Sequence, residues 1–387
     1  MRIKLFFVFF LLLGTSVYAL MEEKEPIKVL RINNVDINHI VFSIDSSYFA
    51  ASSVDGKLVL WDTEKIKSIK TVSAYRGKID FVSFSPDNRN LITIGADSIV
   101  KLWSLPQLKL FQQFTLDFKP SLLSFSPDKT SFIIGTSTGN IIFYSLFSSN
   151  KTKVLPGYGI PVTCVAFSKS SQRCISGYKD GKMIVWSQFD RTLCSVDAHK
   201  NGILMLNYVQ KDRYILTAGE EGAVKFWTSD LFKSTGPVCE LPGDGQFYSI
   251  SPNEKYMSIS CKNNTVKFML IPSGVYAETF SPSVAKITSF AVSPDDKLLL
   301  VGSQAGELYV YRNPSLVAKY NSAIEKGDEA MKYGKYEMAM VKYAEAFGLF
   351  SEKEAETKLK DAKSKKDERQ TAQYKKIKEM RNIYQKK

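Results

Sequence analysis

The chain has 387 residues, of which 44% are hydrophobic and 12% aromatic, and its formal net charge is +13. This is ample for one large core or two domains. Five cysteines without a CxxC pair, together with only two histidines, give a Cys/His zinc site almost no support. The basic excess invites a nucleic-acid interpretation, but its position in the chain matters more than its total.

The N-terminus has the pattern of a secretory signal. Met1–Lys4 is positively charged and Leu5–Leu13 is an unbroken apolar run of nine residues, followed by Val17 and Ala19 at positions −3 and −1 of a signal-peptidase site. This apolar run is too short to span a bilayer comfortably. Residues 1–19 therefore predict a signal peptide whose removal leaves a mature chain in the periplasm or outside the cell. Export argues against a nucleic-acid partner.

The cysteines are expected to be buried free thiols that pack as small apolar residues. Their odd number leaves at least one unpaired within a monomer. Cys164 and Cys174 fall on successive strands of one hairpin. They are the only pair for which the sequence leaves a disulfide as an alternative. The five are Cys164, Cys174, Cys194, Cys239 and Cys261.

Two sequence markers recur at steps of 41 or 42 residues. The first ends an apolar, strand-like run and comprises Phe42, Phe84, Phe125, Phe167, Tyr208, Ile250 and Val292. The second follows in the same register and comprises Trp61, Trp103, Tyr144, Trp186, Trp227, Met269 and Tyr311. Two independent markers that keep one register over seven copies predict a repeat protein.

Each copy contains the pattern of four strands. In the second copy these are Ile79–Ser85, Asn90–Ile94, Ile99–Trp103 and Leu108–Phe114. The Ser-Pro-Asp runs at Ser85, Ser126 and Ser293 are predicted to be turns between first and second strands, and not nucleophile sites. Four strands in a period near 42 residues are typical of a propeller blade.

Over residues 26–312 the chain resembles the WD-repeat β-propeller family. The structural blade residues that carry this resemblance are Trp61, Trp103, Trp186, Trp227, His199, Asp55, Asp97 and Asp180. In that family a His, a Ser or Thr, the turn Asp and the Trp form a hydrogen-bonded set that stiffens each blade. The pattern departs where blades three, six and seven have Thr138, Asn263 and Ala305 at the Asp position.

Blade five alone approaches the family's hydrogen-bonded set. Its members there would be His199, Thr217, Glu221 and Trp227, with Glu as a longer substitute for Asp. Tyr75 and Tyr158 occupy the register of the His in blades two and four.

The predicted fold is mainly β. We expect a seven-bladed β-propeller with four-stranded blades over residues 20–313, plus a small α-helical C-terminal module. The last copy lacks a fourth strand, whereas Pro26–Arg31 is a spare strand before the first copy. Placing this N-terminal strand as the outer strand of blade seven closes the ring and covers an open edge.

Residues 314–350 resemble one tetratricopeptide helical hairpin. The residues that match that repeat are Gly327, Gly334, Tyr336, Ala339, Tyr343 and Ala346. Small residues let two helices approach closely, and the tyrosines fill the space beside them. Residues 351–387 are predicted to be a charged helical tail with 13 basic and 7 acidic residues. This tail is either a solvated helical face or a weak contact for an acidic polymer or a membrane surface.

No catalytic, cofactor or metal motif is found. We therefore expect an exported, non-enzymatic scaffold that binds protein partners, with the propeller as a monomeric platform and the helices as a second docking surface. The candidate partner-binding rim lies in the loops before first strands and comprises Tyr75, Arg76, Phe118, Lys119, Tyr158, Lys200, Asn201 and Asp244. The alternative is an exported enzyme or ligand binder that acts on glycan or cell-wall fragments at the central funnel.

Overall fold

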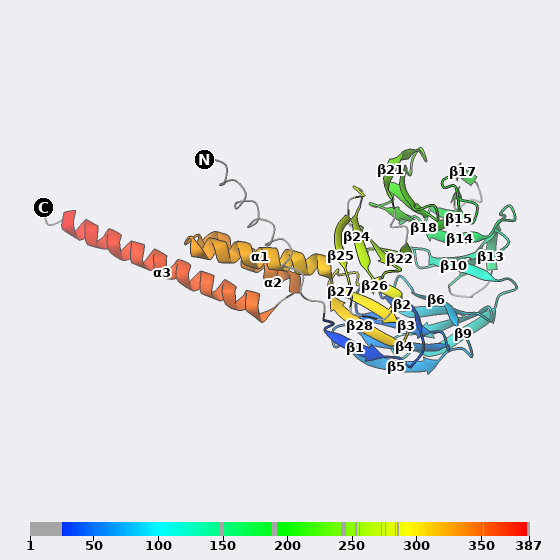
Figure 1. Cartoon of the computed structure of the whole chain (residues 1–387), viewed down its shortest axis with the longest axis horizontal. Helices are drawn as coiled ribbons and strands as arrows, with labels where there is room; N and C mark the ends of the chain where they lie inside the picture. The colour runs from blue at the N-terminus through cyan, green and yellow to red at the C-terminus, as the bar shows by residue number, and fades with distance from the viewer. Residues whose placement is uncertain are drawn as a thin grey trace, which may run out of the picture. The chain divides into compact units, whose positions relative to one another are not determined.

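The computed structural model describes residues 25–146, 151–187, 192–240, 245–251, 254, 256–271, 273–274, 276–282, 284, 286–350 and 352–384. The chain divides into two compact units, one of residues 25–311 and another that begins at Arg312. The first unit is a β-propeller and the second is helical (Figure 1). The predicted signal peptide, residues 1–19, lies outside the described residues.

Seven antiparallel sheets of four strands each form the propeller, as predicted. Blade one consists of β2 (Ile37–Phe42), β3 (Tyr48–Ser53), β4 (Lys57–Asp62) and β5 (Lys67–Ser73), and blade two of β6 (Ile79–Phe84), β7 (Asn90–Gly95), β8 (Ile99–Ser104) and β9 (Lys109–Thr115). Blade three consists of β10 (Pro120–Phe125), β11 (Ser131–Thr136), β12 (Ile141–Ser145) and β13 (Lys151–Leu155), and blade four of β14 (Val162–Phe167), β15 (Arg173–Tyr178), β16 (Lys182–Ser187) and β17 (Thr192–Asp197). Blade five consists of β18 (Ile203–Val209), β19 (Tyr214–Gly219), β20 (Ala223–Thr228) and β21 (Ser234–Glu240), and blade six of β22 (Gly245–Ile250), β23 (Tyr256–Cys261), β24 (Val266–Leu270) and β25 (Tyr276–Phe280). Blade seven consists of β26 (Ile287–Val292), β27 (Leu298–Ser303), β28 (Glu307–Arg312) and β1 (Lys28–Arg31).

The hydrophobic core of the propeller lies between neighbouring blades. One cluster joins Leu58 and Leu60 of blade one to Ile79 and Trp103 of blade two, and similar clusters follow around the ring. A blade therefore buries each face of its sheet against the next blade. A single blade would expose both faces to water, which is why repeats of this kind are stable only as an array.

The N-terminal strand closes the ring, as predicted. β1 pairs with β28 in antiparallel register, with Lys28 opposite Val310 and Arg31 opposite Glu307. Arg31 and Glu307 also form an ion pair of 2.7 Å. The pairing covers the open edge of blade seven and joins the first strand of the propeller to its last.

The turns between first and second strands are held by serine hydroxyls. In blade two, Oγ of Ser85 donates to Oδ1 of Asp87 at 2.5 Å and accepts from the amide of Asn90 at 3.0 Å. Ser126 and Ser293 make the same contacts in their blades. These buried hydroxyls are fully engaged in turns, which agrees with the prediction that they are not nucleophiles.

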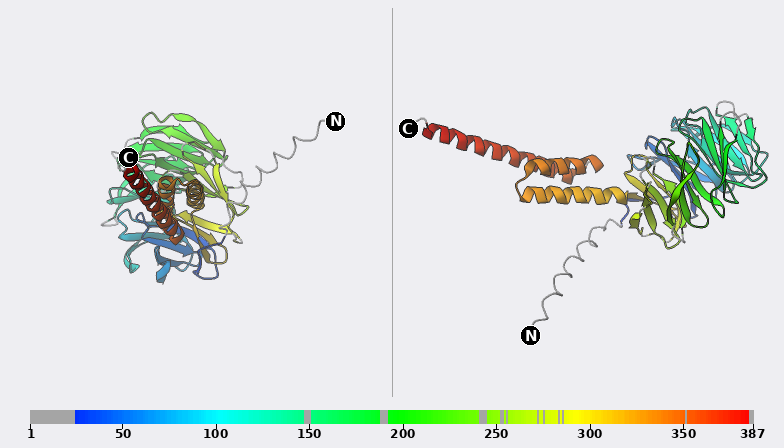
Figure 2. Two further views of the ribbon diagram at one scale, coloured as in Figure 1. Left: turned by 90° about the vertical axis from the view of Figure 1, so that its left-hand side faces the viewer. Right: turned by 90° about the horizontal axis from the view of Figure 1, so that it is seen from above.

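The second unit contains three helices, α1 (Pro314–Lys332), α2 (Tyr336–Phe350) and α3 (Lys353–Tyr384). Pro314 opens α1 at a position where its missing N–H is not needed. α1 and α2 lie side by side (Figure 2), and a small core that includes Tyr320, Ala339 and Tyr343 joins them to α3. Asp328 of α1 pairs with Lys358 of α3 at 2.7 Å.

Candidate functional site

A hydrogen-bonded chain crosses blade five, as predicted. Nε1 of Trp227 donates to Oγ1 of Thr217 at 3.0 Å, and Nε2 of His199 lies 2.8 Å from the same hydroxyl. Nδ1 of His199 lies 2.6 Å from Oε1 of Glu221. The carboxylate of Glu221 can only accept, so Nδ1 of the neutral His199 carries the proton. Nε2 then accepts from the hydroxyl of Thr217, and that hydroxyl accepts from the indole of Trp227. The chain therefore ties two strands, β19 and β20, to the turn between them and to the loop before β18.

The charge state of this chain follows from its burial. Burial lowers the pKa of His199, and the nearby Lys225 adds to this, although Glu221 acts in the opposite direction. Burial acts to raise the pKa of Glu221, but backbone hydrogen bonds and His199 outweigh it and lower that pKa. At neutral pH the pair is thus an uncharged imidazole beside a carboxylate, which suits a structural role.

Tyrosine replaces the histidine in blade two. The hydroxyl of Tyr75 lies 3.0 Å from Oγ1 of Thr93, which also accepts from Nε1 of Trp103 at 2.9 Å. Tyr75 is 7% exposed and packs in the core between blades one and two. Its placement in the partner-binding rim is therefore wrong, because its side chain points into the blade and stiffens it.

The other tryptophans and turn aspartates also have structural contacts. Trp186 donates to Oγ of Ser176 at 2.9 Å, and Trp61 stacks on Phe49 with ring centroids 5.0 Å apart. Asp55 accepts from Asn33 at 2.7 Å, and Asp97 accepts from the amide of Ile99 at 3.1 Å. Asp180 accepts from the amide of Lys182 at 3.1 Å.

Five of the predicted rim residues, each in a loop before a first strand, are exposed. They are Arg76, Lys119, Tyr158, Lys200 and Asn201. Because the blades share one topology, their loops before first strands open on the same face of the propeller. Phe118 is half-buried and packs against the core between blades two and three. Asp244 lies outside the described residues.

Tyr158 is an exposed rim aromatic in a fixed position. Its side chain is 40% exposed, and its hydroxyl donates to Oδ1 of Asp180 at 2.9 Å. Nζ of Lys182 lies 5.3 Å from the ring centroid, and the ring of Tyr178 lies 4.8 Å away. Burial and the hydrogen bond to Asp180 raise the pKa of Tyr158. A rigid, part-exposed aromatic of this kind is a suitable anchor for a protein partner.

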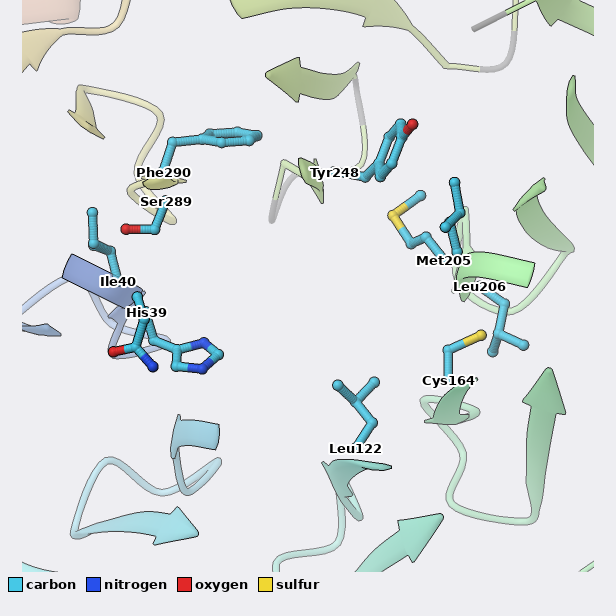
Figure 3. A pocket seen from close by; sticks show the side chains of 11 residues that line it. His39, Ile40, Leu122, Cys164, Met205, Leu206, Tyr248, Ser289 and Phe290 are labelled. Atoms are coloured by element: carbon cyan, nitrogen blue, oxygen red, sulfur yellow. The ribbon is translucent and has the colours of Figure 1, made fainter. Parts of the chain in front are cut away.

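A cavity of about 370 Å³ lies among innermost strands of the propeller (Figure 3). Its lining comes from β2, β10, β14, β18, β22 and β26. In Figure 3 the side chains of Leu122, Cys164, Met205, Tyr248 and Phe290 are arranged around a shared open centre. Apolar and aromatic groups dominate this wall, and its described lining residues include neither Asp nor Glu.

The sequence analysis missed this lining, although a register signal was present. His39, Leu122, Cys164, Met205 and Ser289 all stand three positions before the first marker of their repeat, and all five line the cavity. Burial and the charge of Lys78 lower the pKa of His39 to about 4, so its imidazole is neutral at neutral pH. The part of the chain that the structure describes contains no cluster of three or more potential metal ligands.

Cys164 and Cys174 are free thiols, because they lie on opposite faces of blade four. Cys164 packs between blades four and five, whereas Cys174 packs between blades three and four. Burial raises the pKa of each to about 12. Cys261 is buried, Cys194 is a half-buried free thiol, and the side chain of Cys239 lies outside the described residues.

The residues predicted for the helical hairpin lie in α1, in α2 and in the turn between them. Ala339, Tyr343 and Ala346 are buried, and the hydroxyl of Tyr343 donates to Asp328 at 2.6 Å. A Cβ on Gly327 would lie 2.6 Å from Cδ1 of Tyr343, so this position requires glycine. Gly334 has a φ of +67° in the turn, and Tyr336 lies beside Arg369 of α3. The tetratricopeptide resemblance of this hairpin stays a prediction.

Two family models match three stretches of the chain. The model of the WD domain, G-beta repeat, matches residues 24–62 and 66–104, and that of the Vps8 beta-propeller matches residues 119–232. The β-propeller domain of Cps50 (Swd1) from Myceliophteria thermophila superposes with a TM-score of 0.66 at 15% identity, covering 74% of this chain and 99% of that one. This likeness concerns the fold alone.

Curated relatives share the propeller region at low identity. Telomerase protein component 1 of Rattus norvegicus is 26% identical over 74% of this chain and 11% of its own length. Actin-interacting protein 1 of Drosophila melanogaster is 20% identical over 71% of this chain and 45% of its own. A p21-activated protein kinase-interacting protein 1-like chain of Danio rerio is 21% identical over 50% of this chain and 52% of its own length. The chain thus spans from about a tenth to about half of these relatives. Among the described residues, no helix is long and apolar enough to cross a membrane.

Proposed function

Because this chain carries WD40 repeats and folds as a seven-bladed β-propeller, we propose that it is a non-enzymatic scaffold that binds protein partners. Two of the relatives are named for the proteins with which they interact, actin and a p21-activated protein kinase. The observation that carries the proposal is a rigid ring that presents exposed side chains from equivalent loops on one face.

The basic side chains in these loops would suit an acidic partner. Arg76, Lys119 and Lys200 are exposed, and so are Lys78 and Lys286 in loops of the same kind. Tyr158 adds a fixed aromatic among these basic groups. Complementary charge raises the rate of association and selects partners, and salt screens it. A protein surface with Asp and Glu around an apolar anchor site would fit.

The helical unit is proposed as a second docking surface. Met338 and Val341 of α2 are 55% and 64% exposed, so this helix keeps apolar side chains on its outer face. Binding through both units would make the interaction bipartite, with the basic tail after residue 351 adding mainly to the association rate. The alternative for the tail is a weak contact with an acidic polymer or a membrane surface. In that case, removing the tail should leave the affinity for the protein partner unchanged.

The experiment is a capture of partners from the envelope fraction, followed by affinity measurements on the partner found. The double variant Arg76→Glu, Lys200→Glu should lower the affinity for that partner by about tenfold, since two favourable charges become repulsive. Lys233→Glu, an exposed lysine in a loop on the opposite face, is the matched control and should bind normally. Truncation after Asn313 should also lose affinity. Equal affinity for all variants would contradict both docking surfaces.

Export is part of the proposal and rests on the first 19 residues. The mature protein should begin at Leu20 and occur in the periplasm or outside the cell. Mass spectrometry of the native protein tests this, and an intact Met1–Ala19 segment would contradict it. The glycan-processing alternative needs a pair of carboxylates at the reacting bond. The described lining of the cavity in Figure 3 contributes no carboxylate to such a pair.

A further inference from the structure

We propose that the cavity among the innermost strands is a binding site for a neutral, largely apolar small molecule, such as one built on an aromatic ring. This site is separate from the rim, and the proposal does not depend on the identity of a protein partner. A volume of about 370 Å³ is within the range of small-molecule pockets.

The first argument is the exposure of apolar side chains on a concave surface. Leu204 is 42% exposed, and Leu122 and Met205 are half-buried at the cavity wall. Phe290 and Tyr248 add aromatic surface (Figure 3). Water against these side chains lacks hydrogen-bond partners there, so an apolar ligand that displaces it gains the hydrophobic contribution to binding.

The second argument is that two polar side chains of the wall are already engaged within the protein. Asn38 donates to the carbonyl of Ile79 and accepts from Oγ of Ser52 at 2.9 Å. Oγ of Ser289 donates to the carbonyl of Ile37 at 3.4 Å. A sugar would lose hydrogen bonds to water for each hydroxyl that it buried here, whereas a hydrocarbon loses none.

The third argument is the absence of charge at the described wall. Its lining includes neither acidic nor lysine or arginine side chains, and the lowered pKa of His39 keeps that group neutral at neutral pH. Lys78 and Asp80 lie near His39 and pair with each other at 3.4 Å. A charged ligand would therefore lose its hydration on entering the cavity and would find no oppositely charged side chain there.

The test uses the full chain and the neutral fluorophore N-phenyl-1-naphthylamine. Its fluorescence should rise on binding and saturate at one molecule per chain. Leu204→Arg places a charge at the wall and should weaken binding about tenfold. Leu231→Arg, at an exposed leucine in the loop between β20 and β21, is the matched control and should bind as the wild type does.

A second variant protects the test against misfolding. Met205→Phe narrows the cavity at a half-buried side chain and should also weaken the binding of the fluorophore. The melting temperature of this variant should equal that of the wild type. Calorimetry with chitotriose, a hydrophilic sugar, should detect no binding. The inference is overturned if the fluorophore does not bind, if both cavity variants bind it as tightly as the control, or if chitotriose binds instead.

Discussion

At the scale of residues, the propeller is stiffened by buried polar chains whose members differ from blade to blade. His199 and Tyr75 occupy equivalent positions, and each lies close to a threonine that also accepts from a tryptophan. The shared feature is a threonine hydroxyl that receives the indole N–H. The buried indole N–H would lose its acceptor if the threonine hydroxyl were removed.

Thr217→Val should therefore lower the free energy of unfolding by about 1–3 kcal/mol, because valine keeps the shape and removes the hydroxyl. Urea unfolding followed by tryptophan fluorescence measures the change. Thr115→Val, at an exposed position of β9, is the matched control and should change stability by less than about 0.5 kcal/mol. Equal stability of the two variants would contradict the role of the buried chain.

The two histidines should make the protein less stable in mild acid. Burial lowers the folded-state pKa of both His39 and His199, so below about pH 6.5 the unfolded chain takes up protons that the folded chain resists. Their stabilising contribution is complete above that pH and is lost as the pH falls. We expect a loss of about 1–2 kcal/mol between pH 7 and pH 5.

The measurement is the unfolding free energy at both pH values. The double variant His39→Gln, His199→Gln should be less stable at pH 7 but should lose less between pH 7 and pH 5. The lowered carboxylate pKa values of Asp45, Asp87 and Asp128 act at lower pH and leave this window unaffected. A double variant with the wild-type slope would refute the assignment.

At the scale of elements, the contact between α1 and α2 depends on one glycine. The ring of Tyr343 occupies the space that a side chain at position 327 would need. At Gly348 of α2, by contrast, an added Cβ would have no neighbouring atom within 4 Å. The two glycines therefore separate helix propensity from packing.

Gly327→Ala should destabilise the helical unit, since the clash with Tyr343 outweighs the higher helix propensity of alanine. Gly348→Ala should instead stabilise that unit by about 0.5–1 kcal/mol. Circular dichroism at 222 nm, recorded during thermal unfolding, measures both changes. If the two variants shift the melting of the helices in the same direction, the close packing at Gly327 is not correct.

At the scale of the whole molecule, the chain joins two compact units that have separate cores. The propeller gains its stability from closure, because every blade needs two neighbours to bury its faces. The seam between blades seven and one is held by β1, by an apolar cluster that joins Ile37 and Trp61 to Leu300, and by a hydrogen bond from the amide of Asp295 to Ser46.

Deleting residues 20–33 should therefore open an edge of blade seven and lower the melting temperature or produce oligomers. Deleting only residues 20–24, before β1, is the control and should leave the propeller monomeric and stable. Size-exclusion chromatography and thermal unfolding measure both outcomes. A soluble, monomeric 20–33 deletion with unchanged melting would show that β1 is dispensable for closure.

The sequence by itself determined the blade number, the strand pattern, the closing strand and the members of the polar chain in blade five. These features repeat with a regular period or fall at fixed offsets within one repeat, so neighbouring residues encode them. Only the tertiary structure showed that Tyr75 points inward, that Cys164 and Cys174 face opposite sides of one sheet, and that apolar groups from different blades line a shared cavity. Which face a side chain takes depends on the bulge and register of its strand. The cavity exists only once the ring has closed and brought residues separated by multiples of about 42 positions together.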